Sequence, residues 1–239
     1  DLTDPAVWRR VNPNLGVSID EENFRIEVET KLGKPSARPN LLRYNFNIWS
    51  GEDVQRAIQP DVWAANTAHP ANRAYWRDLE DELAGQDCYG GLDISAGGDL
   101  NALVWLFPPA GARTRWAVLL RFWWPRVRVD EMRRRSRIPV ERWEADGAVT
   151  VTPGNASDHV AIERQIYDDM GKFQVRNLAL DAWNSHQLGI NLAESGVPLE
   201  RVRDGLMSIG PVWKRVEKML MDGDFEHGSH PVLGWNAAC

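Results

Sequence analysis

The chain has 239 residues, of which 43% are hydrophobic, and it carries 12 tryptophans and a formal net charge of −6. This length suits one large domain, or one domain with an appendage, and the composition allows a sizeable core. No apolar run reaches the roughly 18 residues of a membrane-spanning helix, and the first residues lack the layout of a signal peptide, so no membrane association is expected. The two cysteines, Cys88 and Cys239, form neither a disulfide framework nor a metal-ligand spacing, which favours a reducing cytosol.

Residues 1–87 are predicted to form an irregular, partly helical arm. Six prolines interrupt this stretch, and it sustains no period-two alternation of apolar residues. Short helices over residues 20–32 and 72–84 are the regular elements that we expect in it. The pattern changes at residue 88, so the main domain is expected to span residues 88–239.

The main domain begins with three strand-like runs. They cover residues 88–95, 101–108 and 115–123, and short turn signals separate them. Runs joined by such short turns are typical of an antiparallel meander. The sequence therefore predicts three neighbouring antiparallel strands at the start of the domain.

Helices and strands alternate after the meander. A helix over residues 158–172, capped by Asp158, leads to a buried strand over residues 175–182. The remaining expected elements are a helix over 184–194, a short strand over 199–203, and a last helix with Pro211 in its first turn that ends by Gly223. This order predicts an α/β domain with a mixed sheet.

Two aspartates stand at the ends of predicted strands. Asp93 lies near the end of the first strand, and Asp181 lies at the end of the strand over 175–182. If these strands are neighbours, both carboxylates meet at one rim of the sheet, where the active sites of open α/β folds lie. Two close anions repel, and a hard divalent cation with oxygen ligands relieves that repulsion. The alternative is that each aspartate is only a turn or cap residue.

An arginine-rich segment covers residues 121–143. Its eight arginines face three acids, and Trp123, Trp124 and Trp143 are interleaved with them. Guanidinium groups can pair with phosphates while indoles provide packing or stacking surfaces, which suggests a local DNA-binding surface on a protein of negative net charge. The alternative is a solvated helix face with tryptophans in the core. The predicted DNA-binding residues are Arg126, Arg128, Arg133, Arg134, Arg135 and Arg137.

Four segments carry a resemblance to a known family. They are GLDISAGGDLNALVWLF, RFWWPRVRVDEMRRRSRIPVERWEADGAVTVTPG, LALDAWNS and DGDFEHGSHPVLGWN. In this order and spacing they resemble the C-terminal nuclease part of the large terminase subunit of tailed bacteriophages. Two segments of the arm, WRRVNPNLG and FNIWSGEDV, resemble the connection between the packaging ATPase and the nuclease of that family.

The resemblance implies a fold, an activity and partners. The fold is an RNase H-like mixed sheet flanked by helices, and the activity is that of a two-metal-ion endonuclease that uses Mg²⁺ or Mn²⁺ to cut concatemeric phage DNA. Asp93 matches the first metal-binding acid of the family, Asp181 matches the second, and Asp99 matches a recurrent acid with a supporting role. The implied partners are double-stranded phage DNA, the portal protein and the small terminase subunit, in the cytoplasm of the bacterial host.

The sequence also departs from the family pattern. It contains no G-x-x-x-x-G-K-[ST] motif, so packaging ATPase activity is not expected from this chain. The third metal-binding acid of the family lies downstream of HGSHPVLGWN, and the chain ends soon after that segment, so we expect it to be truncated. The residues considered as substitutes are Asp224, Glu226, His227 and His230, against the alternative that they form an exposed loop.

Two other functions remain open at this point. Without a third acid, the chain could be a catalytically silent fragment that docks DNA or the portal. It could also be another RNase H-like nuclease, such as a resolvase or transposase, although the terminase-like flanks argue against that class.

Overall fold

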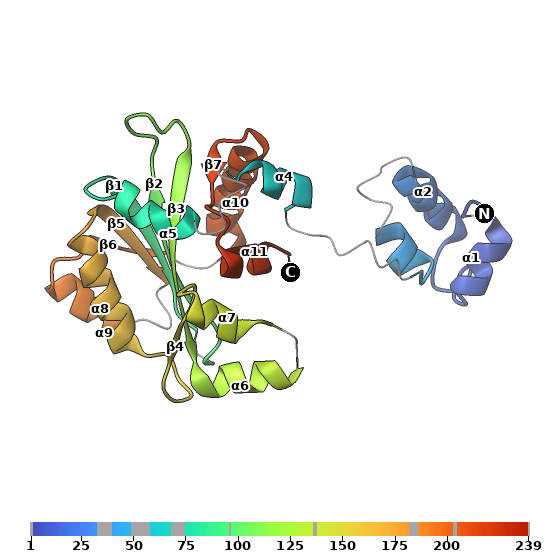
Figure 1. Ribbon diagram of the computed structural model, residues 1–239. Coiled ribbons are helices and arrows are strands. Elements are labelled where there is room, and N and C mark those ends of the chain that lie inside the picture. Colours follow the sequence, from blue (N-terminus) through green and yellow to red (C-terminus); the bar gives the residue numbers. More distant parts are fainter. Residues whose placement is uncertain are drawn as a thin grey trace. The chain divides into compact units, whose positions relative to one another are not determined.

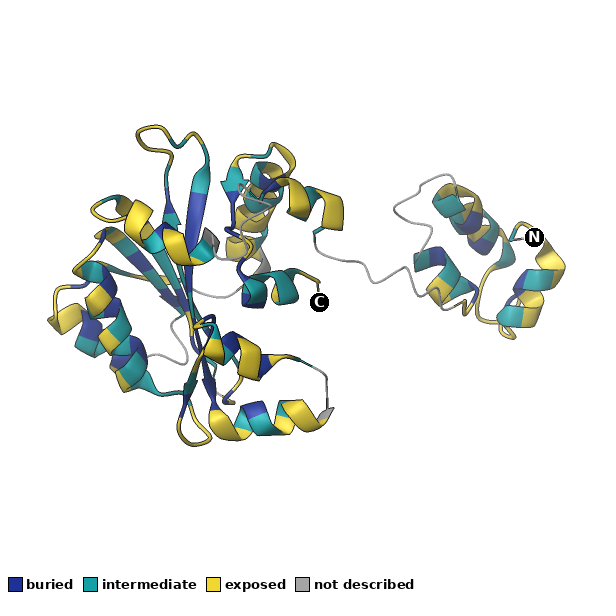
Figure 2. Ribbon diagram, viewed as in Figure 1, coloured by how far each residue is buried: buried dark blue, intermediate teal, exposed yellow. Residues whose placement is uncertain are grey.

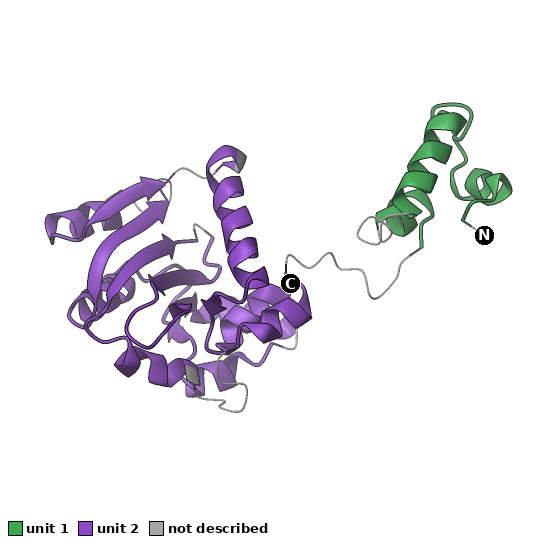
Figure 3. Cartoon of the chain, turned by 90° about the horizontal axis from the view of Figure 1, so that it is seen from above, with its two compact units in different colours: residues 1–57 green, residues 58–239 purple. Residues whose placement is uncertain are grey.

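The computed structural model describes residues 2–32, 40–48, 58–67, 75–95, 97–135, 138–181, 186–202 and 205–238. Two compact units make up the chain, residues 1–57 and residues 58–239 (Figure 3). The helices over residues 60–65 and 75–82, which fall within the expected arm, belong to the second unit. A start of the nuclease domain at residue 88 stays a prediction.

The first unit is a small helical module with an aromatic core. Its elements are α1 (Pro5–Val11), α2 (Glu21–Leu32) and the π-helical turn η2 (Leu41–Asn45). The carboxylate of Asp4 caps α1 by accepting a hydrogen bond from the main-chain N–H of Ala6. The buried rings of Trp8 and Phe24 meet edge to face, with 5.6 Å between their centroids. The helix expected over residues 20–32 is therefore present as α2.

In the described part of the chain, the second unit contains a seven-stranded mixed sheet (Figure 1). Its strands are β1 (Asp87–Asp93), β2 (Asn101–Phe107), β3 (Trp116–Pro125), β4 (Thr150–Thr152), β5 (Gln174–Asp181), β6 (Leu199–Val202) and β7 (Phe225–Glu226). The order is β4-β3-β2-β1-β5-β6, and β7 pairs with the start of β3. Strands β1, β2 and β3 form the expected antiparallel meander, while β5 and β6 continue the sheet in parallel. The predicted α/β class with a mixed sheet is confirmed.

Helices flank both faces of this sheet. They are α4 (Pro60–Ala65), α5 (Tyr75–Glu82), α6 (Arg126–Arg135), α7 (Val140–Ala145), α8 (His159–Met170), α9 (His186–Glu194), α10 (Leu206–Met221) and α11 (Pro231–Ala238). The carboxylate of Asp158 caps α8 as expected, by accepting a hydrogen bond of 3.0 Å from the main-chain N–H of Ala161.

One hydrophobic cluster lies between the sheet and the helices α8 and α9. Alternate residues of β2, including Leu103 and Trp105, point to this face, because side chains of a strand alternate between its two sides. They belong to the same buried cluster as Ile162 of α8 and Leu188 of α9 (Figure 2). Burying each such side chain contributes roughly 1.5–3 kcal/mol.

A second cluster covers the opposite face of β2 and β3. Leu120 of β3 points to this side and clusters with Val129 of α6, Trp143 of α7 and Val232 of α11. The tryptophans of the arginine-rich segment are therefore core residues: Trp123 is in the first cluster, and Trp124 and Trp143 are in the second. They offer no exposed stacking surface.

A buried carboxylate on α8 forms hydrogen bonds to residues of β2 and β3. Asp169 of α8 is fully buried and accepts hydrogen bonds from the indole N–H of Trp105 at 2.7 Å and from two nitrogens of Arg121 at 2.7 and 3.2 Å. Arg121 also donates to Glu80 of α5, which pairs with Lys172. Burial by itself would lower the pKa of Arg121, but the bonds to Asp169 and Glu80 outweigh burial and raise it.

The predicted start of the last helix is wrong. The sequence places Pro211 in the first turn, whereas α10 begins at Leu206 and holds Pro211 in its interior. The extra turn forms because the carbonyl oxygen of Gly205 accepts hydrogen bonds from the N–H groups of Ser208 and Ile209. A proline inside a helix leaves one carbonyl unpaired, and the exposure of the first turns of α10 lets water satisfy that group.

Among the described residues, no helix is both long and apolar enough to cross a membrane.

The buried ion pair generates a prediction about stability. Asp169→Asn removes the fully buried carboxylate partner of Arg121 and leaves only the pair with Glu80, so the free energy of unfolding should fall by about 2 kcal/mol, in the range for a hydrogen bond to a charged group. The matched control is Asp168→Asn, one residue earlier on α8 and exposed, which should change stability by less than about 0.5 kcal/mol. Urea unfolding of the three proteins measures both values, and equal midpoints would contradict the assigned role of Asp169.

Candidate functional site at one rim of the sheet

The two predicted acids end neighbouring parallel strands. Asp93 is the last residue of β1, and Asp181 is the last residue of β5. Leu92 is level with Leu180, so the next residue of each strand brings Asp93 level with Asp181. Adjacent strands lie about 4.8 Å apart, and level residues of parallel strands point to the same face. The two aspartates are therefore side by side at one rim.

A one-residue bulge sets this register. Cys88 is level with Val175, but the next residue, Tyr89, is level with Asn177, so Arg176 is an extra residue in β5. If Arg176 were instead paired with Tyr89 and the register continued unbroken, Asp93 would be level with Leu180, whose side chain lies in the core. A shift by one residue moves a strand's side chains to the opposite face. The bulge thus puts both carboxylates on the same side of the sheet.

The acids project from the face opposite to α8 and α9. Leu92 and Leu180, their preceding neighbours, point into the first hydrophobic cluster, so Asp93 and Asp181 point away from it. Asp93 is exposed and Asp181 is partly exposed. The neighbouring residue on the same face is Gly91, and a Cβ atom built on it would meet no atom within 4 Å. No other atom of the described residues therefore fills the space directly above Gly91 on this face.

Asp99 lies in the turn that joins β1 to β2 at the same rim. Its main-chain N–H donates a hydrogen bond of 2.8 Å to the hydroxyl of Ser95, and its carboxylate is exposed. The turn begins two residues after Asp93 and ends at Asn101, next to Ala102, which pairs with Asp93. The supporting role of Asp99 stays a prediction.

Sequence reasoning missed Asn101. This side chain is fully buried, although it is polar, and its amide oxygen accepts hydrogen bonds of 2.9 Å from the N–H of Ser95 and the hydroxyl of Ser157. A signal was present in the sequence, since Asn101 occupies the same alternating face of NALVWLF as Leu103 and Trp105. A polar residue in the register of core residues indicates a required hydrogen bond.

Two of the residues considered as substitutes for a third acid, Glu226 and Asp224, lie at the other rim. Glu226 of β7 is level with Ala117, near the start of β3, whereas Phe122 of β3 is level with Ala102. Five residues along a strand span about 17 Å, so Glu226 is far from the rim that holds Asp93. The same holds for Asp224, whose carbonyl accepts the N–H of Trp116.

The nearby histidines are core residues and not members of an exposed loop. His227 stacks on Trp63 with 4.0 Å between ring centroids, and burial lowers its pKa. His230 packs against Trp76 and Phe122, and burial lowers its pKa to about 3. The exposed-loop interpretation is therefore wrong for these two residues.

A cavity of about 260 Å³ lies beside β3. Trp76, Arg121, Phe122 and His230 are among its lining residues, and neither aspartate of the rim is among them.

Within the described ranges, no three His, Cys, Asp or Glu side chains gather in a way that could hold a metal ion. The oxygen donors of Asp93 and Asp181 still suit a hard cation such as Mg²⁺ or Mn²⁺.

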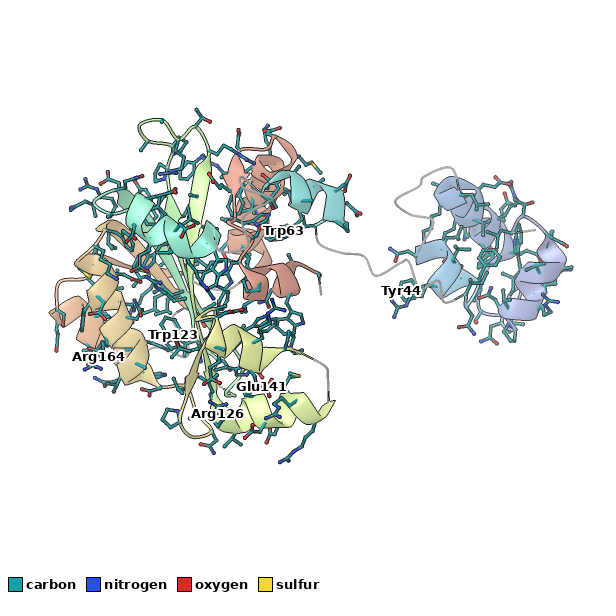
Figure 4. The ribbon with its side chains drawn as sticks, viewed as in Figure 1. Tyr44, Trp63, Trp123, Arg126, Glu141 and Arg164 are labelled. Carbon is teal, nitrogen blue, oxygen red and sulfur yellow. The ribbon has the colours of Figure 1, made fainter. Side chains whose placement is uncertain are left out.

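Most of the described arginines of the predicted DNA surface pair with nearby acids. Arg126 pairs with Glu144 at 2.6 Å, Arg128 with Glu131 at 2.8 Å, and Arg133 with Glu141 at 2.6 Å. Arg126 opens α6, and Glu141 lies on α7 (Figure 4). Arg134 is exposed, whereas Arg137 and the side chain of Arg135 lie outside the described residues. Exposed pairs contribute only about 0–1 kcal/mol each, so phosphates can compete for these arginines.

Comparison with known proteins identifies relatives over the whole chain. The family model described as "Terminase large subunit, endonuclease domain" matches residues 1–238. The large terminase subunit of Enterobacteria phage HK97 is 29% identical over 238 residues, which are 98% of this chain and 44% of that protein. Protein YmfN of Escherichia coli K12 is 24% identical over 248 residues, covering 98% of this chain and 51% of that protein.

A solved structure shows the same fold. The crystal structure of the HK97 bacteriophage large terminase matches with a TM-score of 0.65 and 27% identity, covering 99% of this chain and 47% of that chain. The chain thus spans about half the length of the relatives that it matches.

The alignment of the two acids can be tested by cross-linking. In a Cys239→Ser background, the double variant Asp93→Cys/Asp181→Cys should form a disulfide on mild oxidation, because level strand residues fall within the 4.4–6.8 Å that a disulfide spans between Cα atoms. The native Cys88 should not interfere, since burial raises the pKa of its thiol to about 12. The pair Asp93→Cys/Leu180→Cys, which would be level if the register of Cys88 and Val175 continued without a bulge, should not cross-link in this background, as measured by mass spectrometry of the digest. Equal cross-linking of the two pairs would contradict the role of the bulge.

The buried histidines predict a loss of stability in acid. An unfolded histidine has a pKa of about 6.5, whereas burial lowers the pKa of His230 to about 3, so the unfolded state binds more protons between these values. Stability should be fully present above pH 6.5 and should fall below it. His230→Phe should reduce the loss between pH 6.5 and 5 by up to about 2 kcal/mol, measured by urea unfolding. His186→Gln, at the exposed start of α9, is the control, and a pH profile of His230→Phe parallel to that of the wild type would refute the prediction.

Proposed function

Because the chain belongs to the terminase large subunit endonuclease-domain family, we propose that it cuts concatemeric double-stranded phage DNA during packaging. The reaction proposed is phosphodiester hydrolysis with two Mg²⁺ or Mn²⁺ ions. Its place is the cytoplasm of the bacterial host, and its partners are phage DNA, the portal protein and the small terminase subunit.

The observation that carries this proposal is the register of β1 and β5. Asp93 and Asp181 end neighbouring strands on the same face of the sheet. Two carboxylates this close repel each other, and a divalent cation between them relieves that repulsion. Both side chains lie outside the first hydrophobic cluster.

Each residue of the rim has a role in this proposal. Asp93 and Asp181 hold the cations, which when bound supply an activated water and stabilise the leaving oxygen. Asp99 supports them from the turn beside β1. The space next to Gly91 lets a phosphodiester backbone approach the two carboxylates.

The arginines of α6 are proposed to hold the DNA. This helix begins directly after β3 ends, and that end of β3 lies at the same rim as Asp93. Arg134 is exposed, and the ion pairs of its neighbours are also exposed. An arginine can therefore exchange its carboxylate partner for a DNA phosphate at a small cost in free energy. Such contacts read no base sequence, so binding should be largely sequence-independent.

One observation favours a second function for the isolated chain. The described residues contain no group of three side chains that could hold a metal ion, and two carboxylates bind a cation pair less firmly than three. We therefore expect the 239-residue chain by itself to cleave DNA weakly or not at all and to act as a DNA- or portal-docking part. The family match over residues 1–238 argues against a resolvase or transposase.

The cleavage proposal is tested in the full-length protein. Asp93→Asn and Asp181→Asn should each abolish Mn²⁺-dependent nicking of plasmid DNA, because each removes a charged oxygen ligand. Asp87→Asn is the matched control, since this exposed acid begins the same strand at the opposite rim and should leave nicking unchanged. Agarose gels of supercoiled plasmid measure the outcome, and full nicking by Asp93→Asn or Asp181→Asn would refute the assignment.

The DNA-binding proposal is tested by salt dependence. Replacing Arg133, Arg134 and Arg135 together with alanine removes the guanidinium groups that would bind up to three phosphates. The slope of log K against log salt should then flatten by up to about 2.7, at roughly 0.9 for each phosphate that the variant no longer neutralises. Arg164→Ala on the exposed side of α8 is the control (Figure 4). Titration of labelled duplex at several salt concentrations measures the slopes, and an unchanged slope in the triple variant would place the DNA elsewhere.

A further inference from the structure

Asn101 occupies a position that would normally hold an apolar side chain. It is the first residue of β2, it is fully buried, and it shares its face of the sheet with Leu103 and Trp105. Burying an amide costs free energy unless its hydrogen bonds are made. The contacts of Asn101 should therefore show what it is for.

The two shortest contacts of Asn101 bind the segment that follows Asp93. Its Oδ1 accepts hydrogen bonds of 2.9 Å from the main-chain N–H of Ser95 and from the hydroxyl of Ser157. Its Nδ2 makes longer contacts, 3.4 Å to the carbonyl of Trp123 and 3.5 Å to that of Asp99. The side chain thus uses all of its donors and acceptors, and Oδ1 makes the stronger bonds.

Ser95 forms hydrogen bonds through its N–H and its hydroxyl oxygen, and its carbonyl shares the single proton of the Ser157 hydroxyl with Asn101. Its N–H donates to Asn101, and its carbonyl lies 3.1 Å from the hydroxyl of Ser157. Its own hydroxyl oxygen accepts hydrogen bonds from the N–H groups of Gly97 at 3.1 Å and Asp99 at 2.8 Å. The main chain just after Asp93 therefore has little freedom to move.

Packing restricts the same turn from outside. Gly98 has a φ of +78°, and a Cβ atom built there would lie 2.7 Å from the carbonyl oxygen of Asn155. The segment before α8 thus presses on the turn at Gly98 and is bonded to it through Ser157. On the other side, Asp93 is paired with Ala102, the residue after Asn101.

We propose that Asn101 and Ser157 are positioning residues for Asp93. They point to the face of the sheet opposite to the carboxylates and touch no cation, so they act through the main chain of Ser95. The inference rests on the proposed function, in which Asp93 holds a metal ion. Outer-shell partners of metal ligands typically change metal affinity by about 10- to 100-fold, and an effect transmitted through the main chain belongs at the lower end of that range.

The test measures Mn²⁺ binding to the folded full-length protein by calorimetry. Asn101→Leu keeps the branching of the side chain, at a larger volume, and removes its hydrogen bonds, and Ser157→Ala removes one hydroxyl. Both variants should bind Mn²⁺ about 10-fold more weakly than the wild type. Ser157→Thr keeps the hydroxyl and should restore the affinity to that of the wild type. Thr152→Val is the control, because Thr152 is also a buried polar residue near this rim but its hydroxyl makes no hydrogen bond to a described residue.

The outcomes separate this inference from the proposed function. A merely structural role would lower the melting temperature of Asn101→Leu and Ser157→Ala and leave their Mn²⁺ affinity when folded equal to that of the wild type, which overturns the inference. If Asn101→Leu does not fold, Ser157→Ala decides. Asp93→Asn is measured alongside: loss of binding in this variant alone refutes the inference and leaves the proposed function intact. Wild-type affinity in Asp93→Asn, or no binding by the wild type, overturns both.

Discussion

The alignment of Asp93 with Asp181 depends on a bulge that leaves one residue of β5, Arg176, out of the pairing with β1. A strand shows its side chains alternately to two faces, so two strand-end acids share a face only if the register between their strands is correct. The bulge at Cys88 and Tyr89 supplies that correction, since it lets Val175 and Leu178 both reach the core while Asp181 comes level with Asp93. The same bulge therefore places the apolar side chains of β5 in the core and its terminal carboxylate at the rim. A slip of the register by one residue would move both sets of side chains to the wrong face.

The two faces of the sheet separate stability from chemistry. On the face of α8 and α9, the buried pair of Asp169 and Arg121 and the indole of Trp105 join the helices to the meander. On the other face, the carboxylates of the rim stand beside open space. Substituting the rim acids should therefore change the proposed chemistry without loss of the fold. Substituting Asp169 should instead lower stability without removing a group of the rim. Asn101 links the two sides, because its side chain lies in the core and its hydrogen bonds hold the segment after Asp93.

The electrostatics of α6 suit reversible contact with DNA. Its described arginines are paired mainly with acids of α6 and α7, so the net charge of −6 is compatible with a local basic surface. Surface ion pairs are weak, and a phosphate can take the place of a carboxylate at small cost. Binding of this kind depends strongly on salt and slightly on base sequence. It fits the proposed function, in which the chain holds DNA of any sequence beside the rim.

Local rules were enough to predict the meander, the strand that ends in Asp181 and the cap of Asp158, because alternation and capping depend on residues close in sequence. They also placed Asp93 and Asp181 at strand ends, and the resemblance of four segments named the family that the comparisons confirm. Only the tertiary structure revealed the bulge at Arg176, the contacts of Asn101 and the position of Glu226 at the rim opposite to Asp93. These features depend on which distant strands pair and in which register, and that is decided by the packing of the whole sheet and not by any short segment.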